Sequence, residues 1–267
     1  MAQNLGPADT ARQKAAAARR EQVSANRRRR QLIVGAAVLS AIVALVAVGV
    51  AVQQKKASVD AAYGSGPVRA PAGAVGDGAL AIPYGASAGA KVTLTVYEDF
   101  RCPYCRMAEG LFESAYRSYA QAGRIRVEYH LVDLIDHNLG GNGSLRAANA
   151  AACAQDAGAG RFEAYHDLLY ANQPDENDDA YGSDAALLGL AAKVDGLDTA
   201  AFKTCLDSGA HASWVKKNYD ALSTLLHGQV ATPYYAIDGV QFQLDGRAPA
   251  AQQAAFKAAL DAALARA

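Results

Sequence analysis

The sequence lacks several features that would indicate other classes of protein. Its 26 Lys and Arg residues balance 26 Asp and Glu residues, so the formal net charge is zero and no bulk charge favours nucleic acid. No Gly-rich phosphate loop follows a strand, and no nicotinamide or flavin fingerprint is present. We therefore expect no cofactor and no nucleic-acid partner.

Cysteine is absent before residue 100, and the four cysteines that follow are Cys102, Cys105, Cys153 and Cys205. No second Cys-x-x-Cys accompanies the first pair, and no two histidines have the spacing of a zinc site. We therefore expect no bound metal. A purely structural disulfide in so short a loop is also disfavoured, which leaves a reactive pair as the main hypothesis for Cys102 and Cys105.

The charges are unevenly distributed near the N-terminus. Eight Lys or Arg residues precede Gln31, against two acids, and residues 32–52 contain no charged side chain. A helix of that length would be roughly 31 Å long, which matches the hydrocarbon core of a bilayer. The sequence thus predicts a disordered basic tail at 1–30 and a single transmembrane helix at 31–53.

The alternatives for this apolar segment are a cleaved signal peptide and a buried core helix. The apolar region of a signal peptide is usually about 7–15 residues, which is shorter than this one. Because basic flanks remain on the cytoplasmic side, the tail is expected in the cytoplasm and everything after about residue 53 outside the cell. Disulfides form and persist in that compartment. The chain is therefore expected to be anchored in the cell membrane.

Residues 54–90 are rich in Gly, Ala, Ser and Pro, which is typical of a tether, with a short strand at 79–83 as an option. The globular domain is expected over 91–267. Apolar periodicity and turn residues define its elements. Strands are expected at 92–97, 125–134, 234–237 and 240–244, and helices at 105–122, at about 144–227 as a helical insertion, and at 250–266. This order predicts an α/β domain.

The motif Cys102-Pro103-Tyr104-Cys105 lies between a strand and an amphipathic helix. Its spacing brings both sulfurs to one side of the helix start, within bonding range. We expect Cys102 at the exposed helix tip, where free N–H groups and the helix dipole favour a thiolate, and Pro103 fits the first turn. The pKa of Cys102 should then fall from about 8.5 into the range of roughly 3.5–7.5. Cys105, less exposed, is suited to resolve a mixed disulfide.

Three motifs over about residues 78–266 carry a resemblance to a known family. They are Phe100 with the Cys-Pro-Tyr-Cys segment, the helical insertion, and Ala231-Thr232-Pro233. Together they resemble the DsbA-like branch of the thioredoxin superfamily, including its membrane-anchored actinobacterial members. The resemblance implies a thioredoxin-like fold with a helical insertion.

The resemblance also implies a substrate-binding site. In that family the proline corresponding to Pro233 is cis and faces the cysteine pair, and an extended substrate segment pairs with the backbone at Thr232. Pro103 and Tyr104, between the two cysteines, complete the substrate-binding residues. The sequence alone would instead favour a trans proline at a strand start.

The function that we expect is the formation of disulfides in secreted or surface proteins, with a membrane partner reoxidising the cysteine pair. Tyr104 stands where the best-known oxidases have His, and Thr232 is commoner among reductases and isomerases. A reductase or isomerase, for example one supporting cytochrome c maturation, is therefore the first alternative. The second is a copper chaperone that uses Cys102 and Cys105 as soft ligands.

Cys153 and Cys205 lie 52 residues apart in the predicted helical insertion. Outside the cell they are expected to form a structural disulfide rather than to remain two buried thiols, and related actinobacterial proteins imply the same bridge. Strand alternation predicts that only one of Glu98 and Asp99 points inward, as an acid that could help proton transfer from Cys105. His166 is expected to be a packed or helix-surface residue.

Overall fold

The computed structural model describes residues 63–85 and 89–267. The predicted basic tail at 1–30 and the predicted transmembrane helix at 31–53 lie outside the described residues. Within the part of the chain that the structure describes, no helix combines the length and the apolar character needed to cross a membrane.

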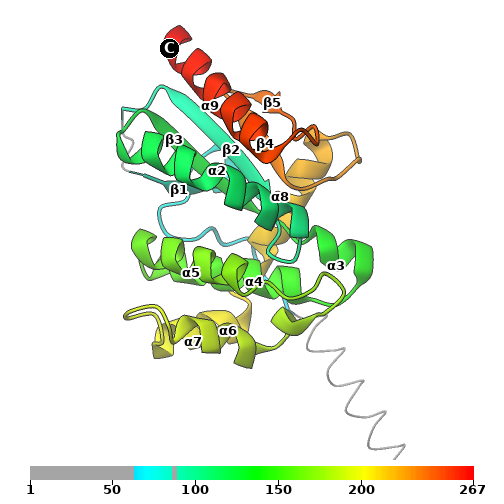
Figure 1. Ribbon diagram of the computed structural model, residues 1–267. Helices are drawn as coiled ribbons and strands as arrows, with labels where there is room; N and C mark the ends of the chain where they lie inside the picture. Colours follow the sequence, from blue (N-terminus) through cyan, green and yellow to red (C-terminus); the bar gives the residue numbers. More distant parts are fainter. Residues whose placement is uncertain (1–62, 86–88) are drawn as a thin grey trace, which may run out of the picture. The chain divides into compact units, whose positions relative to one another are not determined.

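Five strands form one mixed sheet (Figure 1). They are β1 (Ile82–Tyr84), β2 (Val92–Glu98), β3 (Ile125–Leu131), β4 (Tyr234–Ile237) and β5 (Val240–Phe242). The strand order is β1-β3-β2-β4-β5. The two central strands, β2 and β3, run parallel with Leu94 opposite Val127, and the other neighbours are antiparallel. The predicted order of elements is confirmed, although β3 and β5 are shorter than predicted.

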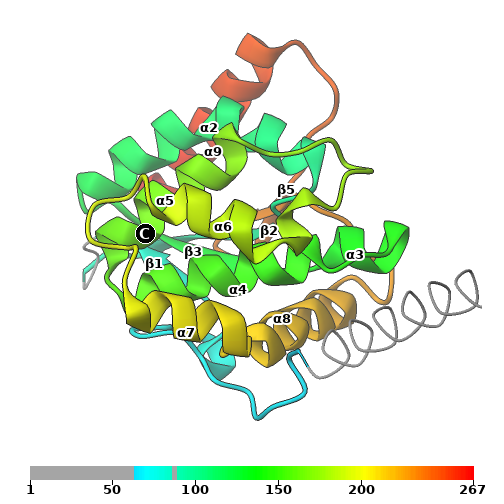
Figure 2. The same ribbon diagram turned by 90° about the horizontal axis from the view of Figure 1, so that it is seen from below.

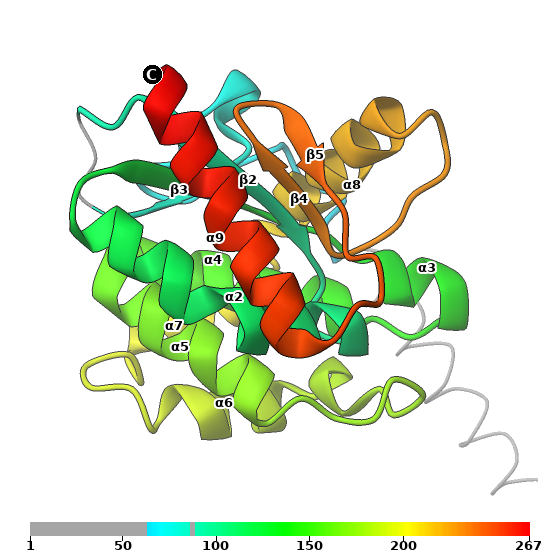
Figure 3. The same ribbon diagram turned by 45° about the horizontal axis from the view of Figure 1, so that its top comes forward.

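Two helices, α2 (Pro103–Gln121) and α9 (Pro249–Arg266), cross one face of the sheet (Figure 3). Aromatic side chains join them to the strands. Phe112 of α2 stacks on Phe256 of α9 with ring centroids 4.4 Å apart, and Tyr235 of β4 meets Phe112 edge-on at 5.5 Å. Burial of these large rings fixes the start of α2 against the sheet, because aromatic pairs of this kind add to the free energy of burial.

The helical insertion follows β3 (Figure 2). Its helices are α3 (Leu134–Leu139), α4 (Gly143–Asp156), α5 (Ala159–Ala171), α6 (Asp184–Ala191), α7 (Ala200–Ser208) and α8 (Ala212–Leu225). The insertion therefore begins at Leu134 rather than at about residue 144. The buried carboxylate of Asp99 accepts a hydrogen bond from the Ile135 N–H at 2.8 Å and satisfies one of the free donors of the first turn of α3.

Helix α4 is the centre of this insertion and contacts α5, α7 and α8. It is buried along almost its whole length, since its many alanines allow neighbouring helices to approach closely on every side. Cys153 of α4 forms a disulfide with Cys205 of α7, as the sequence predicted. The bridge joins the two helices through cysteines that are 52 residues apart along the chain.

The segment predicted as a tether, 54–90, is folded onto the domain over residues 63–85, and the strand considered at 79–83 is found as β1. Tyr63 is buried and its hydroxyl donates to the Leu206 carbonyl oxygen at 2.9 Å. The Trp214 indole donates to the Ala79 carbonyl oxygen at 2.8 Å, and β1 then joins the edge of the sheet. A few specific anchors therefore order a segment whose composition is that of a flexible linker, and the folded region begins before Lys91.

Removal of the Cys153–Cys205 disulfide should lower the free energy of unfolding by about 2–4 kcal/mol, because a bridge across 52 residues restricts the unfolded chain. The comparison is the Cys153→Ala/Cys205→Ala pair against the parent, both in a Cys102→Ser/Cys105→Ser background so that no other thiol exchanges. Urea denaturation gives the difference. A loss below about 1 kcal/mol would contradict an entropic role for the bridge.

Candidate active site

The cysteine motif forms the junction between β2 and α2. Cys102 is the N-cap residue with extended backbone angles, and Pro103 occupies the first helical position. The N–H groups of Cys105 and Arg106 both donate to the Cys102 carbonyl oxygen, at 3.1 and 3.3 Å. The helix therefore starts at the motif, and proline fits there because the first helical position needs no N–H donor.

Both sulfurs of the motif are covered, and both cysteines are free thiols. Cys102 is 3% exposed and Cys105 is 1% exposed, so the expectation of an exposed Cys102 is wrong. The cover comes from the segment before β4, where the Thr232 carbonyl oxygen accepts from the Cys102 thiol at 3.6 Å. The backbone N–H of Asp99 lies 3.5 Å from the Cys105 sulfur and donates to it. A thiol that reacts with Cys102 must therefore approach beside Thr232.

The surroundings of the two cysteines shift their pKa values in opposite directions. A hydrogen bond from the Cys105 thiol lowers the pKa of Cys102 to about 6, and smaller contributions come from Thr232 and the N–H groups of Cys105 and Tyr104, against the effect of burial. Burial, together with the Cys102 thiolate beside it, raises the pKa of Cys105 well above its ordinary value. At neutral pH the reduced pair therefore holds one thiolate, on Cys102, and one thiol, on Cys105.

A groove opens beside the pair. The Thr232–Pro233 peptide bond is cis, as the resemblance implied. The groove, of about 440 Å³, is lined by Tyr104, Met107, Thr232, Pro233, Gln241, Phe242, Gln243, Leu244 and Gly246. Three of the four predicted substrate-binding residues thus line it, and Pro103 does not. We call this cavity the cis-proline groove.

The apolar wall of the cis-proline groove was not predicted from the sequence. Met107 and Tyr104 project from the first turns of α2 with 47% and 64% of their surface exposed, and Phe242 comes from β5. Exposed large apolar side chains gathered at one place indicate a binding surface. The signal in the sequence was Met107 itself, which is two residues beyond the motif and has no place on the buried stripe of α2.

Two consecutive acids at the end of β2 both point inward, so the prediction that only one is buried is wrong. Glu98 and Asp99 are 1% and 0% exposed. The carboxylate of Asp99 accepts from the N–H groups of Arg101 and Ile135 at 2.7 and 2.8 Å, and burial raises its pKa to about 8. Both oxygens of Asp99 thus hold the backbone of the loop. The side chain is buried because the helical insertion covers what would otherwise be an exposed strand end.

Glu98 belongs to a buried cluster that also contains Glu109 of α2 and His166 of α5. His166 Nε2 lies 2.8 Å from a Glu98 carboxylate oxygen. Burial alone would lower the pKa of His166, but the adjacent Glu98 raises it to about 10. His166 is therefore an imidazolium at neutral pH. We call Glu98, Glu109 and His166 the buried acid–histidine cluster.

Glu109 is the member of this cluster that lies on α2, the helix that begins at the motif. It follows Cys105 by one helical turn on the buried face of α2, and residues at this spacing are neighbours. Tyr235 donates to one of its oxygens at 2.7 Å and Tyr116 to the other. Burial, with a contribution from Glu98, raises the pKa of Glu109 to about 7. Glu109 can therefore gain or lose a proton near neutral pH.

A pocket of about 360 Å³ gives the cluster access to solvent. Its lining includes Glu109, His166, Arg106, Tyr170 and Asp167. Protons that reach Glu109 can therefore exchange with water on the side of α2 that faces α5, away from the cis-proline groove.

Two groups of side chains in the described residues have the donor types of a metal site. In one, Cys153 and Cys205 are joined in the disulfide and offer no thiolate. In the other, the buried acid–histidine cluster, His166 pairs with Glu98, and Glu109 accepts from two tyrosines. The disulfide in the first group and the hydrogen bonds in the second therefore engage most of the atoms that could bind a metal ion. The chemistry of the site uses the sulfurs of Cys102 and Cys105.

The rate of Cys102 alkylation should follow a titration with a midpoint at about pH 6 in the reduced chain, rather than the value of about 8.5 for free cysteine. Since only the thiolate reacts, the rate is constant above this midpoint and falls tenfold per pH unit well below it. Peptide mass spectrometry after iodoacetamide pulses gives the rate at Cys102 alone.

The matched variants are Cys105→Ala and Cys105→Ser. Alanine removes the thiol that lowers the pKa of Cys102, so the midpoint should rise by at least about one unit, whereas serine keeps a hydroxyl donor at the same position. An unchanged midpoint in Cys105→Ala would assign the effect to the helix terminus instead.

Comparison with solved structures gives clear matches to this fold. DsbA of Mycobacterium tuberculosis is 26% identical over 70% of this chain and 99% of its own, with a TM-score of 0.54. DsbG of the same organism is 27% identical over 71% of this chain and 96% of its own, with a TM-score of 0.55. The MdbA protein of Corynebacterium diphtheriae is 21% identical with a TM-score of 0.56, over 74% of this chain and 95% of its own, and shows the fold alone.

No curated protein sequence matches the chain. A family model described as thioredoxin matches residues 81–262. The match covers β1, the cysteine motif, the helical insertion, the cis proline and most of α9. The resemblance expected from the motif is thus confirmed, and the chain belongs to the thioredoxin family.

Proposed function

We propose that this chain is a thiol–disulfide oxidoreductase that forms disulfides in secreted or surface proteins through Cys102 and Cys105. The observation that carries the proposal is the pairing of a stabilised Cys102 thiolate with a buried Cys105 thiol at a helix start. Solved proteins with the same fold and about a quarter of their residues identical are named DsbA and disulfide bond oxidoreductase, which supports this chemistry.

The reaction begins with the oxidised chain, in which Cys102 and Cys105 form a disulfide. A substrate thiolate attacks the Cys102 sulfur, and the bond to Cys105 breaks with its electron pair on Cys105. A second substrate thiolate then attacks the substrate sulfur of the mixed disulfide and releases Cys102 as a thiolate. The substrate has lost two electrons and two protons, and the reduced pair has gained two electrons.

The low pKa of Cys102 favours the last step, since a sulfur that is stable as a thiolate is a better leaving group. It also favours the reduced pair over the oxidised one, and so a more oxidising couple. A membrane partner that accepts the two electrons would restore the disulfide.

We assign Glu109 as the acid that donates a proton to the departing Cys105 sulfur. The departing Cys105 sulfur is buried and its pKa is well above the ordinary value, so it must take up a proton as the bond breaks. Glu109 lies one turn along the buried face of α2, titrates at about pH 7, and reaches solvent through its own pocket. Asp99, whose oxygens accept backbone N–H groups, does not line this pocket.

The substrate would bind as an extended segment along the backbone at Thr232, with an apolar side chain in the cis-proline groove. The groove offers Met107, Phe242 and Leu244 as apolar contacts and the exposed ring of Tyr104 at its edge. Extended binding of this kind depends on main-chain hydrogen bonds, while the groove selects side chains. A partly unfolded protein offers such segments.

The proposed compartment is outside the cytoplasmic membrane, with residues 31–53 as the anchor and the N-terminus in the cytoplasm. The charge difference across the apolar segment supports this orientation. The Cys153–Cys205 disulfide also supports it, since such bridges persist in oxidising compartments.

Substrates should accumulate on Cys102 when Cys105 is replaced by serine. The Cys102 thiolate attacks a disulfide of an oxidised substrate, the reverse of the last step above, and no Cys105 thiol is present to displace the substrate from the mixed disulfide. The full-length Cys105→Ser chain, expressed in its host and quenched in acid, should carry envelope proteins linked to Cys102, which mass spectrometry identifies. The Cys102→Ser/Cys105→Ser chain is the matched control. Recovery of no thiol-linked protein above that control would overturn the proposed function.

The Glu109→Gln variant should slow the release of Cys105 by on the order of 100-fold at pH 7, the usual contribution of one acid–base group. Stopped-flow measurement of the reaction between the oxidised chain and a model thiol isolates this step. The rate of the parent should depend on pH near 7, and that dependence should vanish in the variant. Glu176→Gln, in the loop after α5, is the control. Equal rates for Glu109→Gln and the parent would exclude Glu109 as the proton donor.

A further inference from the structure

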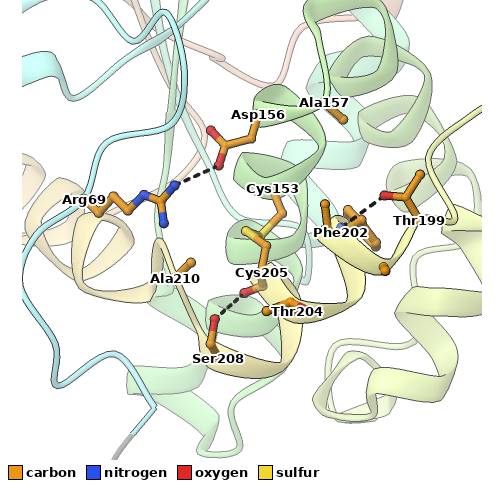
Figure 4. A pocket seen from close by; sticks show the side chains of 12 residues that line it. Arg69, Cys153, Asp156, Ala157, Thr199, Phe202, Thr204, Cys205, Ser208 and Ala210 are labelled. Atoms are coloured by element: carbon orange, nitrogen blue, oxygen red, sulfur yellow. Dashed lines mark hydrogen bonds and ion pairs between the residues drawn. A yellow bond between two sulfur atoms is a disulfide. The ribbon is translucent and has the colours of Figure 1, made fainter.

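The Cys153–Cys205 disulfide does not lie in a closed core. It forms part of the wall of a pocket of about 490 Å³ between α4, α7 and the segment before β1 (Figure 4). In Figure 4 the two sulfurs lie at the centre of the lining side chains, with Arg69 and Asp156 on one side and Thr199 on the other. We call this cavity the disulfide pocket. A structural bridge that faces a cavity of this size can be reached by a small molecule.

The two sulfurs differ in exposure. Cys205 is half-buried on α7, whereas Cys153 is only 2% exposed on the central helix α4. An incoming nucleophile therefore reaches Cys205 first. Because thiol–disulfide exchange is an in-line displacement between sulfurs, attack at Cys205 makes Cys153 the leaving sulfur.

A polar side chain lies beside the leaving sulfur. A ring nitrogen of His211 and the sulfurs of Cys153 and Cys205 all lie within 4.8 Å of one another. The ring is fixed by hydrogen-bond contacts of 2.8 Å to the Arg69 carbonyl oxygen and to the Asp156 carboxylate. His211 thus places a buried polar ring, rather than an apolar wall, beside the departing Cys153 sulfur.

The rim of the disulfide pocket carries groups that bind polar ligands. The Arg69 side chain is 67% exposed and lies 3.9 Å from Asp156, so much of its guanidinium faces solvent. The hydroxyl residues Thr204 and Ser208 lie on the α7 side. A guanidinium at the mouth of a cavity binds carboxylates with suitable geometry.

From these observations we propose that the disulfide pocket binds a low-molecular-weight thiol that carries a carboxylate, and that Cys205 is its site of attachment. The thiolate attacks the Cys205 sulfur, a new disulfide forms between the small molecule and Cys205, and the Cys153–Cys205 bond breaks. The electron pair goes to Cys153, which leaves as a thiolate and takes a proton. The step is an exchange of one disulfide for another, so it needs no further oxidant or reductant.

The consequence is a reversible change in the helical insertion. Attachment removes the covalent link between α4 and α7 and leaves a bound group at the position of the link. Attack of the Cys153 thiolate on Cys205 reverses the reaction and releases the small thiol. The site is independent of the reaction at Cys102, because it uses a different pair of sulfurs on the helical insertion.

The test uses the purified full-length chain with Cys102→Ser and Cys105→Ser, so that its only sulfur pair is Cys153–Cys205. Glutathione serves as the probe because it is a small thiol with two carboxylates. After incubation under native conditions, acid quenching and alkylation, peptide mapping should show glutathione on Cys205 and the alkylating group on Cys153. An adduct on Cys153, equal adducts on both, or an adduct only in denaturant would overturn the proposal.

Two tryptophan substitutions on α7 test whether the thiol reaches the Cys153–Cys205 disulfide through the pocket or whether the disulfide is simply easy to reduce from any side. Ala201 lines the pocket one turn before Cys205, so Ala201→Trp covers the disulfide and should slow attachment at least about tenfold. Lys203 lies on the opposite side of α7, and Lys203→Trp should leave the rate unchanged. Equal rates in the two variants would show that attack does not pass through the pocket.

The role of Arg69 has its own readout. Arg69→Gln should slow attachment of glutathione by about three- to tenfold at low ionic strength, while the rate with uncharged 2-mercaptoethanol stays the same. Equal effects on the rates of both thiols would show that Arg69 does not bind the carboxylate of the small thiol. Because this chain contains neither Cys102 nor Cys105, a negative result here leaves the proposed function untouched.

Discussion

The hydrogen bond from the Cys105 thiol to the Cys102 thiolate is the interaction on which the chemistry of this protein depends. It is the largest contribution to the low pKa of Cys102, ahead of the helix N–H groups that the sequence alone would emphasise. The bond requires Cys105 to keep its proton, and burial ensures this by raising the pKa of Cys105. The two thiols are therefore one unit, in which each holds the other in the form needed for exchange.

The helical insertion supplies the surroundings that this unit needs. Gln173, in the loop after α5, donates to the carbonyl oxygens of Phe100 and Cys102, each at 2.9 Å, and so holds the start of the motif. Helix α5 also contributes His166, which pairs with Glu98 in the cluster that contains Glu109, the acid one turn after Cys105 on α2. The insertion thus covers the cysteine pair on one side and gives it a route for protons, while the cis-proline groove lies on the other.

Much of the fold could be predicted from the sequence. Strand β2 and helix α2 have clear apolar periodicity, the motif marks the start of α2, and α9 sets Phe256 and Leu260 on one face. The buried acid–histidine cluster could not be predicted. Strand alternation assigns Glu98 and Asp99 to opposite faces. Both are nevertheless buried, because Glu98 is enclosed with His166 of α5 and Asp99 holds the Ile135 N–H of α3. The segment at 63–85 was missed for a similar reason, since a few contacts from Tyr63 and Trp214 order a chain of linker composition.

The paired thiols determine the direction of electron flow. The reduction potential of the Cys102–Cys105 couple measures this direction. A thiolate that is stabilised in the reduced pair makes the couple oxidising, so equilibration with glutathione should give a value between about −180 and −120 mV, the range of known disulfide-forming proteins. A potential near about −270 mV, that of a thioredoxin reductant, would contradict the account.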